Sequence, residues 1–243
     1  MRVAINASAM LGTRTGIGQY TRQLITEIRI RQDVELSLFV GRDWAETVPP
    51  DAAGRSLLKT VAAWVPGALE LSRLVRQHRF ERGARGGVVD VYHEPGFVPY
   101  RFDGPTVISV HDLSFVRFPH MHPPARVAYM ERHVPSAVKN ASIVLTDSEF
   151  IKNELVNLFG TDPGKVVAIP LGASEGCRPA DETEIMPVIG RYDLGFRRYL
   201  LTVGTFEPRK NLVQVVRAYR ALPKSVQARL PLAMVGARGW RNG

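Results

Sequence analysis

The fold is decided by the stretch Leu200-Leu-Thr-Val-Gly-Thr-Phe-Glu-Pro-Arg-Lys-Asn-Leu212, which lies near the C-terminus of the chain. It predicts a short apolar strand, a tight turn at Gly204 and a helix that begins near Asn211. Arg209 and Lys210 stand where free backbone N–H groups and the positive end of the helix dipole favour an anion. The stretch therefore fits a phosphate-binding turn. It also fits an ordinary βα turn with solvated basic residues, so the rest of the chain has to decide.

Composition limits the possible classes of protein. The apolar fraction of 45% is that of a globular protein, and the single cysteine, Cys177, excludes a disulfide framework and indicates a reducing compartment. The N-terminus lacks the apolar core of a secretion signal, and the longest apolar-rich stretch, 57–71, is too short to cross a bilayer. We therefore expect a cytoplasmic protein. Its net charge of +9 favours an anionic partner, such as nucleic acid, an acidic membrane face or a phosphorylated substrate.

A second glycine-rich turn lies near the N-terminus. A strand at 2–7 is followed by a loop that contains Gly16 and Gly18, then by a helix and a strand at 35–40, which together form a βαβ unit. The two glycines allow the backbone to approach a ligand closely, although a tight strand-to-helix turn also explains them. An NADP-dependent oxidoreductase is the alternative here. Against it, the third glycine of G-x-G-x-x-G is Thr21, and Arg42 stands in place of the acidic residue that binds a ribose.

Two histidines end predicted strands. His93 closes a strand at 88–93, and His111 closes a strand at 106–111. Ligands of parallel α/β sheets bind at this edge, so the matching positions favour function over a capping or core histidine bonded to Asp112. His120 and His122 lie in a proline-rich loop where no set of three or four ligands can be assembled, so we expect no metal site.

Strands and helices alternate along most of the chain. This order predicts an α/β protein with an open parallel sheet covered on both faces over residues 1–172. Residues 173–197 break the pattern and read as an interdomain connection with one short helix. Residues 198–243 then begin a second β-α unit, whose next strand is 232–235. Further elements are expected as strands at 143–146 and 166–169 and as helices at 124–140 and 149–159.

One helical segment, Arg73 to Arg85, is both basic and apolar. Such a segment can rest on an anionic membrane surface, although a solvated basic face is the commoner explanation. Its cationic or titratable residues are Arg73, Arg76, His78, Arg79, Arg82 and Arg85, and the apolar residues within it or just before it are Leu69, Leu71, Leu74, Val75 and Phe80.

Taken together, pieces of the chain resemble the family 4 retaining glycosyltransferases, and among them the bacterial mannosyl- and rhamnosyltransferases of surface polysaccharide and lipopolysaccharide synthesis. The resemblance implies a GT-B fold, in which residues 1–172 are a Rossmann-like acceptor-side domain and residues 198–243 begin the nucleotide-sugar-binding domain. The matching pieces, in the family's order, are Gly12-Thr-Arg-Thr-Gly-Ile-Gly18, Val91-Tyr-His-Glu-Pro95, Val110-His-Asp-Leu113, Ala141-Ser-Ile-Val-Leu-Thr-Asp-Ser-Glu-Phe150, Val167-Ala-Ile-Pro-Leu-Gly172 and Val203-Gly-Thr-Phe-Glu-Pro-Arg-Lys-Asn-Leu212.

The resemblance also implies the reaction. It would move mannose or a related hexose, with retention and without a metal or cofactor, from a nucleotide-diphosphate donor to a lipid-linked saccharide. A GDP-linked donor is favoured over a UDP-linked one, and the enzyme would act in the cytoplasm or on the inner membrane face. The implied site residues are Gly16 and Gly18 near the donor diphosphate, His111 at the donor sugar, and Gly204, Thr205, Arg209 and Lys210 at the phosphates. Thr205 stands where many relatives have an arginine.

The resemblance predicts that the natural protein continues past Gly243. About 45 residues follow Arg198, where a domain of about 100 to 200 is expected. The family's pair of glutamates, eight positions apart, has no copy here. Besides the oxidoreductase, a noncatalytic basic module that binds nucleic acid or membrane is an alternative. Because the sequence lacks the aromatic and basic motifs of nucleic-acid binders, we expect no nucleic-acid partner.

Overall fold

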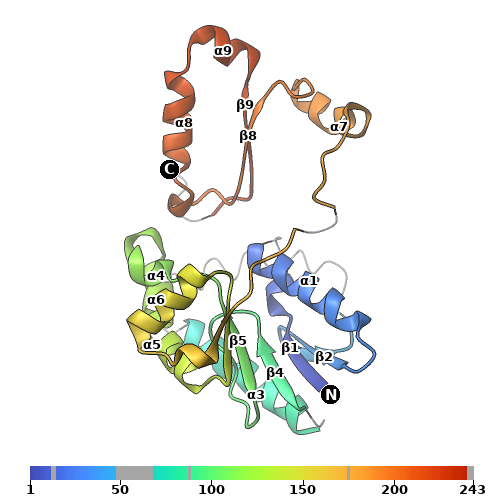
Figure 1. Cartoon of the computed structure of the whole chain (residues 1–243), viewed down its shortest axis with the longest axis vertical. Coiled ribbons are helices and arrows are strands. Elements are labelled where there is room, and N and C mark those ends of the chain that lie inside the picture. The colour runs from blue at the N-terminus through green and yellow to red at the C-terminus, as the bar shows by residue number, and fades with distance from the viewer. Residues whose placement is uncertain (12–14, 48–67, 87–88, 174–175, 240–243) are drawn as a thin grey trace. The chain divides into compact units, whose positions relative to one another are not determined.

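A computed structural model of the chain describes residues 1–11, 15–47, 68–86, 89–173 and 176–239. The chain forms two compact units, Met1–Gly172 and Ala173–Gly243, and Figure 1 labels most of their helices and strands. Residues 12–14 of the N-terminal glycine-rich loop and most of the apolar stretch 57–71 lie outside the described residues. No helix in the described ranges is both long and apolar enough to cross a membrane.

The first unit is built on a seven-stranded sheet with the order β3-β2-β1-β4-β5-β6-β7. All neighbouring strands are parallel except β3, which runs antiparallel to β2. The predicted parallel α/β sheet is therefore confirmed, and the edge strand β3 is an addition to it. The strands are β1 (Arg2–Asn6), β2 (Glu35–Val40), β3 (Asp43–Ala45), β4 (Val91–Glu94), β5 (Thr106–Val110), β6 (Ile143–Thr146) and β7 (Val166–Ala168).

Alternation along β1 and β2 sends side chains to two separate cores. Val3, Ile5 and Leu38 pack with Ile25 of helix α1 (Gly16–Ile30). Their sequence neighbours Ala4 and Phe39 pack instead with Phe80 of helix α3 (Ala68–Gly86). Because successive side chains of a strand point to opposite faces, α1 and α3 cover opposite faces of the sheet.

The second half of this unit follows the sequence closely. Helix α5 (Pro124–Asn140) and helix α6 (Glu149–Phe159) both begin and end where the periodicity places them, and a short helix α4 (Ser114–Arg117) follows β5. The Ser148 hydroxyl accepts a hydrogen bond from the Ile151 amide, which satisfies one unpaired donor at the start of α6. Gly160 ends α6 in the left-handed conformation, with φ of 60°.

The second unit contains one parallel βαβ arrangement. Strands β8 (Leu200–Val203) and β9 (Leu232–Val235) pair in parallel and are joined through helices α8 (Leu212–Ala221) and α9 (Lys224–Arg229). The short helix expected in the connection is α7 (Glu182–Ile189). The residues Pro208–Lys210 form a separate 3-10 turn, and Asn211 is left-handed with φ of 51°. Arg209 and Lys210 therefore precede α8 and are not part of its first turn.

Candidate functional site at the carboxyl ends of the strands

The strand order of the first sheet reverses between β1 and β4. The chain runs outward from β1 through β2 to β3 on one side, and from β4 to β7 on the other. In open α/β sheets such a reversal leaves a crevice at the carboxyl ends of the two strands, where ligands bind. Asn6 ends β1 and Glu94 ends β4, and the Asn6 side-chain amide donates to Glu94 Oε2 at 2.7 Å.

A pocket of about 270 Å³ opens at this position. Its walls come from the ends of β1 and β4, from the loop after β4, from α3 and from α5. The lining residues are Asn6, Arg73, Arg76, Glu94, Phe97, Val98, Tyr100, Tyr129 and Met130.

Glu94 is the buried acid of the pocket. Its carboxylate accepts from the Asn6 amide, from the Tyr92 hydroxyl at 2.8 Å and from the Gly96 backbone N–H at 3.0 Å. Burial raises the pKa of Glu94 to about 7, against the lowering effect of these hydrogen bonds and, last, of the Arg73 charge. Glu94 therefore sits near the midpoint of its titration at neutral pH.

Arg73 and Arg76 place two cations on the same wall, one helical turn apart. Arg73 donates to the Tyr129 hydroxyl at 3.1 Å and to the Pro99 carbonyl at 2.7 Å, and its guanidinium lies 6.0 Å from the centre of the Tyr100 ring. Among the described residues, Arg76 bonds to Ser72 of its own helix and to no other side chain or carbonyl. Within the described part of the chain, neither guanidinium forms an ion pair with a carboxylate at 4 Å or less. Part of the basic segment is thus turned into the pocket.

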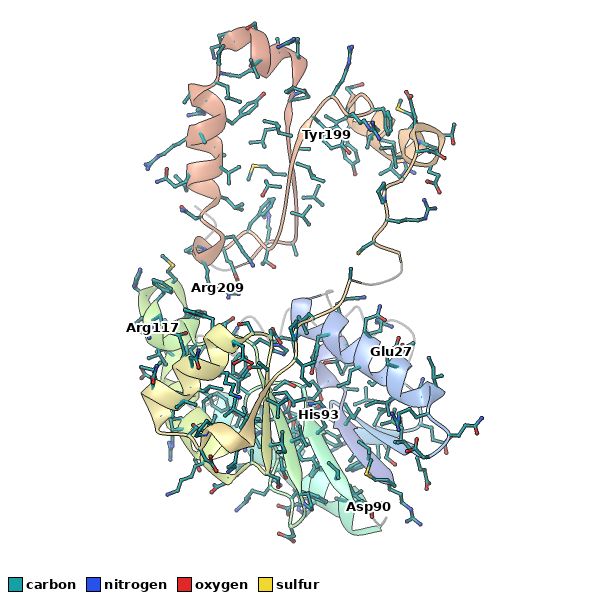
Figure 2. The ribbon with its side chains drawn as sticks, viewed as in Figure 1. Glu27, Asp90, His93, Arg117, Tyr199 and Arg209 are labelled. Carbon is teal, nitrogen blue, oxygen red and sulfur yellow. The ribbon has the colours of Figure 1, made fainter. Side chains whose placement is uncertain are left out.

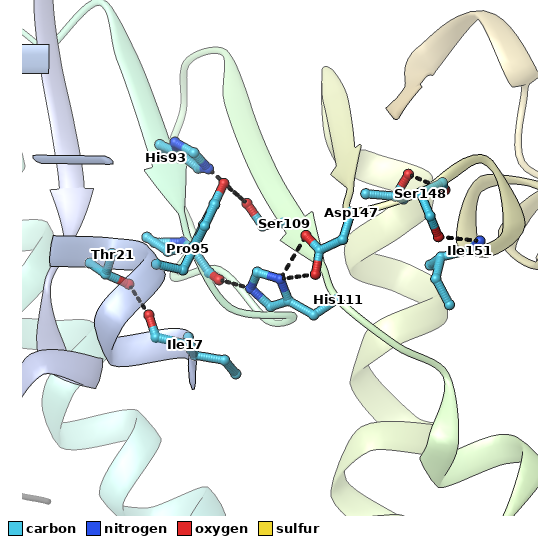
Figure 3. Close-up of polar contacts among 11 residues, drawn as sticks. Ile17, Thr21, His93, Pro95, Ser109, His111, Asp147, Ser148 and Ile151 are labelled. Atoms are coloured by element: carbon cyan, nitrogen blue, oxygen red, sulfur yellow. Dashed lines mark hydrogen bonds and ion pairs between the residues drawn. The ribbon is translucent and has the colours of Figure 1, made fainter. Parts of the chain in front are cut away.

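His111 lies directly after β5, as expected, but its partner is Asp147 and not the adjacent Asp112. Its Nδ1 is 3.0 Å from both Asp147 oxygens, and its Nε2 is 2.9 Å from the Pro95 carbonyl oxygen (Figure 3). Both partners only accept, so the two bonds form together only when both ring nitrogens carry hydrogen. A ligand that contacts the His111 ring nitrogens has to replace one of these bonds. Asp112 instead accepts from the backbone N–H and the hydroxyl of Ser114, the first residue of α4.

His93 is buried and belongs to a separate chain of hydrogen bonds. Its Nε2 lies 3.0 Å from the Ser109 hydroxyl, which in turn lies 3.0 Å from the Tyr20 hydroxyl (Figure 3 shows the His93 bond). Burial, with a smaller contribution from His111, lowers the pKa of His93 to about 4. His93 is therefore a neutral core histidine, while Tyr20 packs edge-on against His111 with ring centres 4.9 Å apart.

The two N-terminal glycines differ in their surroundings. A Cβ on Gly18 would lie 2.5 Å from the Ala9 carbonyl oxygen, and the Gly18 N–H already donates to the Thr15 hydroxyl at 3.1 Å. A Cβ on Gly16 would meet nothing within 4 Å. Gly18 thus has a packing reason for being glycine, and Gly16 has none among the described residues.

In the second unit, the turn after β8 lies at the carboxyl ends of two neighbouring parallel strands. The Gly204 N–H donates to the Val235 carbonyl at 2.9 Å, and a Cβ on Gly236 would lie only 1.8 Å from the Gly204 oxygen. The Lys210 side chain runs beside Gly204. Among the described residues its ammonium has neither a hydrogen-bond partner nor an ion pair.

Arg209, on the same turn (Figure 2), is held by an acid that the sequence reasoning did not consider. Its guanidinium bonds to Glu207 Oε1 at 3.0 and 3.2 Å. Thr205, the next candidate, follows Gly204 directly and is half-buried. The structure therefore keeps Gly204, Thr205, Arg209 and Lys210 on one short loop.

Metal-binding residues do not gather in the described ranges. No group of three or more His, Cys, Asp or Glu side chains there is arranged to hold an ion. His122 instead bonds to Ser114 at 2.8 Å.

Sequence reasoning missed Glu94 and Asp147 as site residues. Both stand at the carboxyl end of a strand, as His111 does, so the rule that selected His111 would also have found them.

Comparison with known proteins identifies the family. A family model described as a glycosyl transferase 4-like domain matches residues 15–172. The chain is 32% identical over 237 residues to O-antigen chain mannosyltransferase B of Escherichia coli, which covers 94% of this chain. The chain spans 62% of the length of that relative.

Two solved structures share the fold. Sucrose-phosphate synthase from Thermosynechococcus elongatus superposes with a TM-score of 0.59 at 14% identity, over 97% of this chain and 70% of its own. Anabaena HepE, solved in complex with UDP-glucose, gives a TM-score of 0.61 at 14% identity, over 100% of this chain and 62% of its own. The expected GT-B type of α/β fold is thereby confirmed, and since the family model matches more than half of the residues, the chain belongs to the glycosyl transferase 4-like family.

Proposed function

We propose that the protein transfers a hexose, with mannose favoured, from a nucleotide-diphosphate donor to a saccharide acceptor. Family membership supports the reaction class, and the name of the Escherichia coli relative supports mannose. The observation that carries the proposal is the Lys210 ammonium, which lies without a partner in the described ranges beside the Gly204 turn.

Lys210 serves the departing nucleotide in this proposal. When the glycosidic bond to the donor breaks, negative charge develops on the leaving diphosphate. A fixed cation aimed at developing charge is an effective catalytic device, and hydrogen bonds to charged groups are stronger than neutral ones. Arg209 is the second cation, kept on the turn by Glu207. Gly204 and Thr205 supply the backbone around the phosphates.

The donor is proposed to be GDP-linked, with UDP-linked sugars as the comparison, because HepE was solved with UDP-glucose. Retention of configuration without a metal or cofactor is part of the same proposal. His111 would contact the donor sugar by exchanging one of its two ring bonds for a sugar hydroxyl. Of the N-terminal glycines, Gly16 is the better candidate for close approach to the donor, since the Gly18 N–H is already occupied.

The acceptor is proposed to be lipid-linked, and α3 to rest on an anionic membrane. Leu71, Leu74 and Val75 follow helical spacing and are 66%, 60% and 48% exposed, and the exposed Arg79 and Arg82 follow on the same helix. Apolar side chains with adjacent cations match an anionic bilayer surface. The protein should float with anionic vesicles, and the double change Leu71→Ser with Leu74→Ser should abolish flotation. Phe150→Ser is the control and should not abolish it, because Phe150 is an exposed apolar residue of another helix, α6. Equal flotation with neutral and anionic vesicles would contradict the docking.

Titration calorimetry with GDP-mannose and UDP-glucose tests the donor site. Lys210→Ala should weaken donor binding about 10- to 100-fold, since a hydrogen bond to a charged group contributes about 1.5–3 kcal/mol. Lys224→Ala, an exposed lysine of α9 in the same unit, is the matched control. The proposal fails if the full-length protein transfers no sugar to a lipid-linked saccharide and Lys210→Ala leaves donor binding unchanged. A thermal shift with NADP, but with neither GDP-mannose nor UDP-glucose, would favour the oxidoreductase.

A further inference from the structure

We infer that the pocket between β1, β4, α3 and α5 binds one sugar ring of the acceptor. The inference rests on the proposed function and adds a binding site to it. The position supports a ligand site on its own, because the pocket lies at the strand-order reversal of the first sheet, where Asn6 and Glu94 end neighbouring strands.

The walls offer the two kinds of surface that a sugar ring needs. A pyranose has an apolar C–H face and a rim of hydroxyls, and each hydroxyl both donates and accepts. Phe97, Tyr100 and Tyr129 provide apolar aromatic surface. Glu94 only accepts when ionised, whereas Arg73 and Arg76 only donate. Acceptors and donors thus face one cavity.

Glu94 retains capacity for one more bond. A carboxylate has about four acceptor positions. Within the described part of the chain three are used, by Asn6, Tyr92 and Gly96. A sugar hydroxyl that donates to Glu94 would complete the set and stabilise a buried charge that burial otherwise disfavours.

The same acid argues against a phosphate as the occupant. Arg73 and Arg76 alone would suit an anion, but a fully ionised phosphoryl group has only acceptor oxygens to offer, and the ionised Glu94 carboxylate also only accepts. A dianion beside an ionised carboxylate is repelled, and the buried Glu94 cannot turn away from the pocket without losing its three hydrogen bonds. A hydroxyl-rich neutral ring satisfies both kinds of wall.

The size of the pocket favours a single ring. Pockets that bind drug-sized ligands have volumes of about 300–1,000 Å³. The volume of about 270 Å³ falls just below that range, so the pocket suits one monosaccharide unit of a longer chain.

The pocket is also connected to His111. The loop after β4 forms one wall, and the His111 Nε2 bond to the Pro95 carbonyl holds that loop. The Phe97 ring, which lines the pocket, lies 6.2 Å from the His111 ring. A change in the hydrogen bonds of His111 would therefore shift the loop that forms this wall of the sugar pocket.

Methyl α-D-mannopyranoside is the probe for the test, titrated into the protein and followed by amide chemical shifts in two-dimensional NMR. Shifts should concentrate in the 94–100 loop and in α3. Arg73→Gln and Glu94→Gln should each weaken the interaction at least five-fold. Arg79→Gln is the matched control because Arg79 lies on the same helix but pairs with Asp43 at the surface. If Glu94→Gln does not fold, Arg76→Gln replaces it, since the hydrogen bonds of Arg76 within the described residues go to Ser72 of the same helix.

Shifts at the pocket with inorganic phosphate but none with the glycoside would overturn the inference, as would equal glycoside affinity in Arg73→Gln and Arg79→Gln. Donor affinity, measured separately by calorimetry, distinguishes the two proposals. If the glycoside does not bind, but the donor binds and its affinity depends on Lys210, only the assignment of the sugar pocket is overturned. Glycoside binding in a protein that binds no nucleotide sugar and transfers none overturns the proposed function and leaves the pocket assigned.

Discussion

Gly16 and Gly18 permit a direct test of whether a glycine serves binding or packing. Both were expected to approach the donor diphosphate. A Cβ at Gly18 would lie 2.5 Å from the Ala9 oxygen and 3.2 Å from the Thr15 hydroxyl, whereas one at Gly16 meets no described atom within 4 Å. Gly18→Ala should therefore destabilise the first unit, and Gly16→Ala should not.

The magnitude follows from the contact. Because ordinary contact begins near 3.4 Å, the Ala9 backbone has to move by about 0.9 Å, or α1 by the same amount. Overpacking of this kind costs about 1–3 kcal/mol. Alanine is the better helix former by about 0.5–1 kcal/mol, which offsets part of the cost at Gly18 and gives a small gain at Gly16. We expect a net loss of about 1–2 kcal/mol for Gly18→Ala and no loss for Gly16→Ala.

Native-state hydrogen exchange of the β1 and β2 amides measures this free energy within the unit that holds both glycines. Urea unfolding should agree, with the Gly18→Ala midpoint lower by about 0.5–1 M for a typical slope. Equal stability of the two variants would refute the packing explanation for Gly18. The folded Gly16→Ala variant then reports on function alone, so a loss of GDP-mannose affinity in it would assign Gly16 to the donor.

Three further changes test the two sites. Asp147→Asn removes the charge opposite His111 and should cost the first unit about 1–2 kcal/mol in urea unfolding, because Asp147 is only 27% exposed; Asp43→Asn, which is 82% exposed, is the control. Gly236→Ala would drive a Cβ into the Gly204 oxygen, so donor affinity should fall although no charged group is removed, and an unchanged affinity would separate the Gly204 turn from the donor site. The pKa of Glu94 is raised from 4.5 to about 7, so its stability contribution falls as pH rises through that window, whereas the pKa of His93 is lowered from 6.5 to about 4, so its contribution rises with pH. Each shift amounts to about 3 kcal/mol of stability. Since each variant leaves only the other residue's contribution, the free energy of unfolding between pH 4.5 and 6.5 should rise with pH in Glu94→Gln and fall in His93→Gln. Parallel stability–pH profiles of the two variants would contradict these pKa shifts.

The elements of the fold could be predicted because each carries its own local signal. Each of these signals depends only on near neighbours in sequence: the alternation of Val3 and Ile5, the Ser148 cap, and the periodicity of α5 and α6. Strand β3 was missed because three residues, one of them Asp43, are too few to show a period. The start of α8 was placed one residue early because the left-handed Asn211 separates it from the 3-10 turn.

The partners of the site residues could not be predicted, because they depend on the order of strands in the sheet. His111 was found from its place at a strand end, but the sequence suggested its neighbour Asp112 as partner. Parallel pairing of Val110 with Thr146 instead brings Asp147 beside it from 36 residues away. In the same way the pairing of Ile5 with His93 joins Asn6 to Glu94 across 88 residues. Local sequence patterns predict where each strand ends, but they do not predict which strands are neighbours in the sheet.

The two glycine turns that the sequence indicated as candidates for the donor phosphates have different chemistry. In the first turn, the Gly18 N–H already donates to the Thr15 hydroxyl, and packing requires glycine at this position. The sheet edge beside this turn carries a pocket lined by an acid, two arginines and aromatic rings. The second carries a lysine without a partner among the described residues. Fixed positive charge suits a diphosphate, whereas mixed donors and acceptors suit hydroxyls. The stretch 200–212 is therefore the stronger candidate for the phosphates of the donor, and the reversal point of the first sheet is the stronger candidate for a sugar.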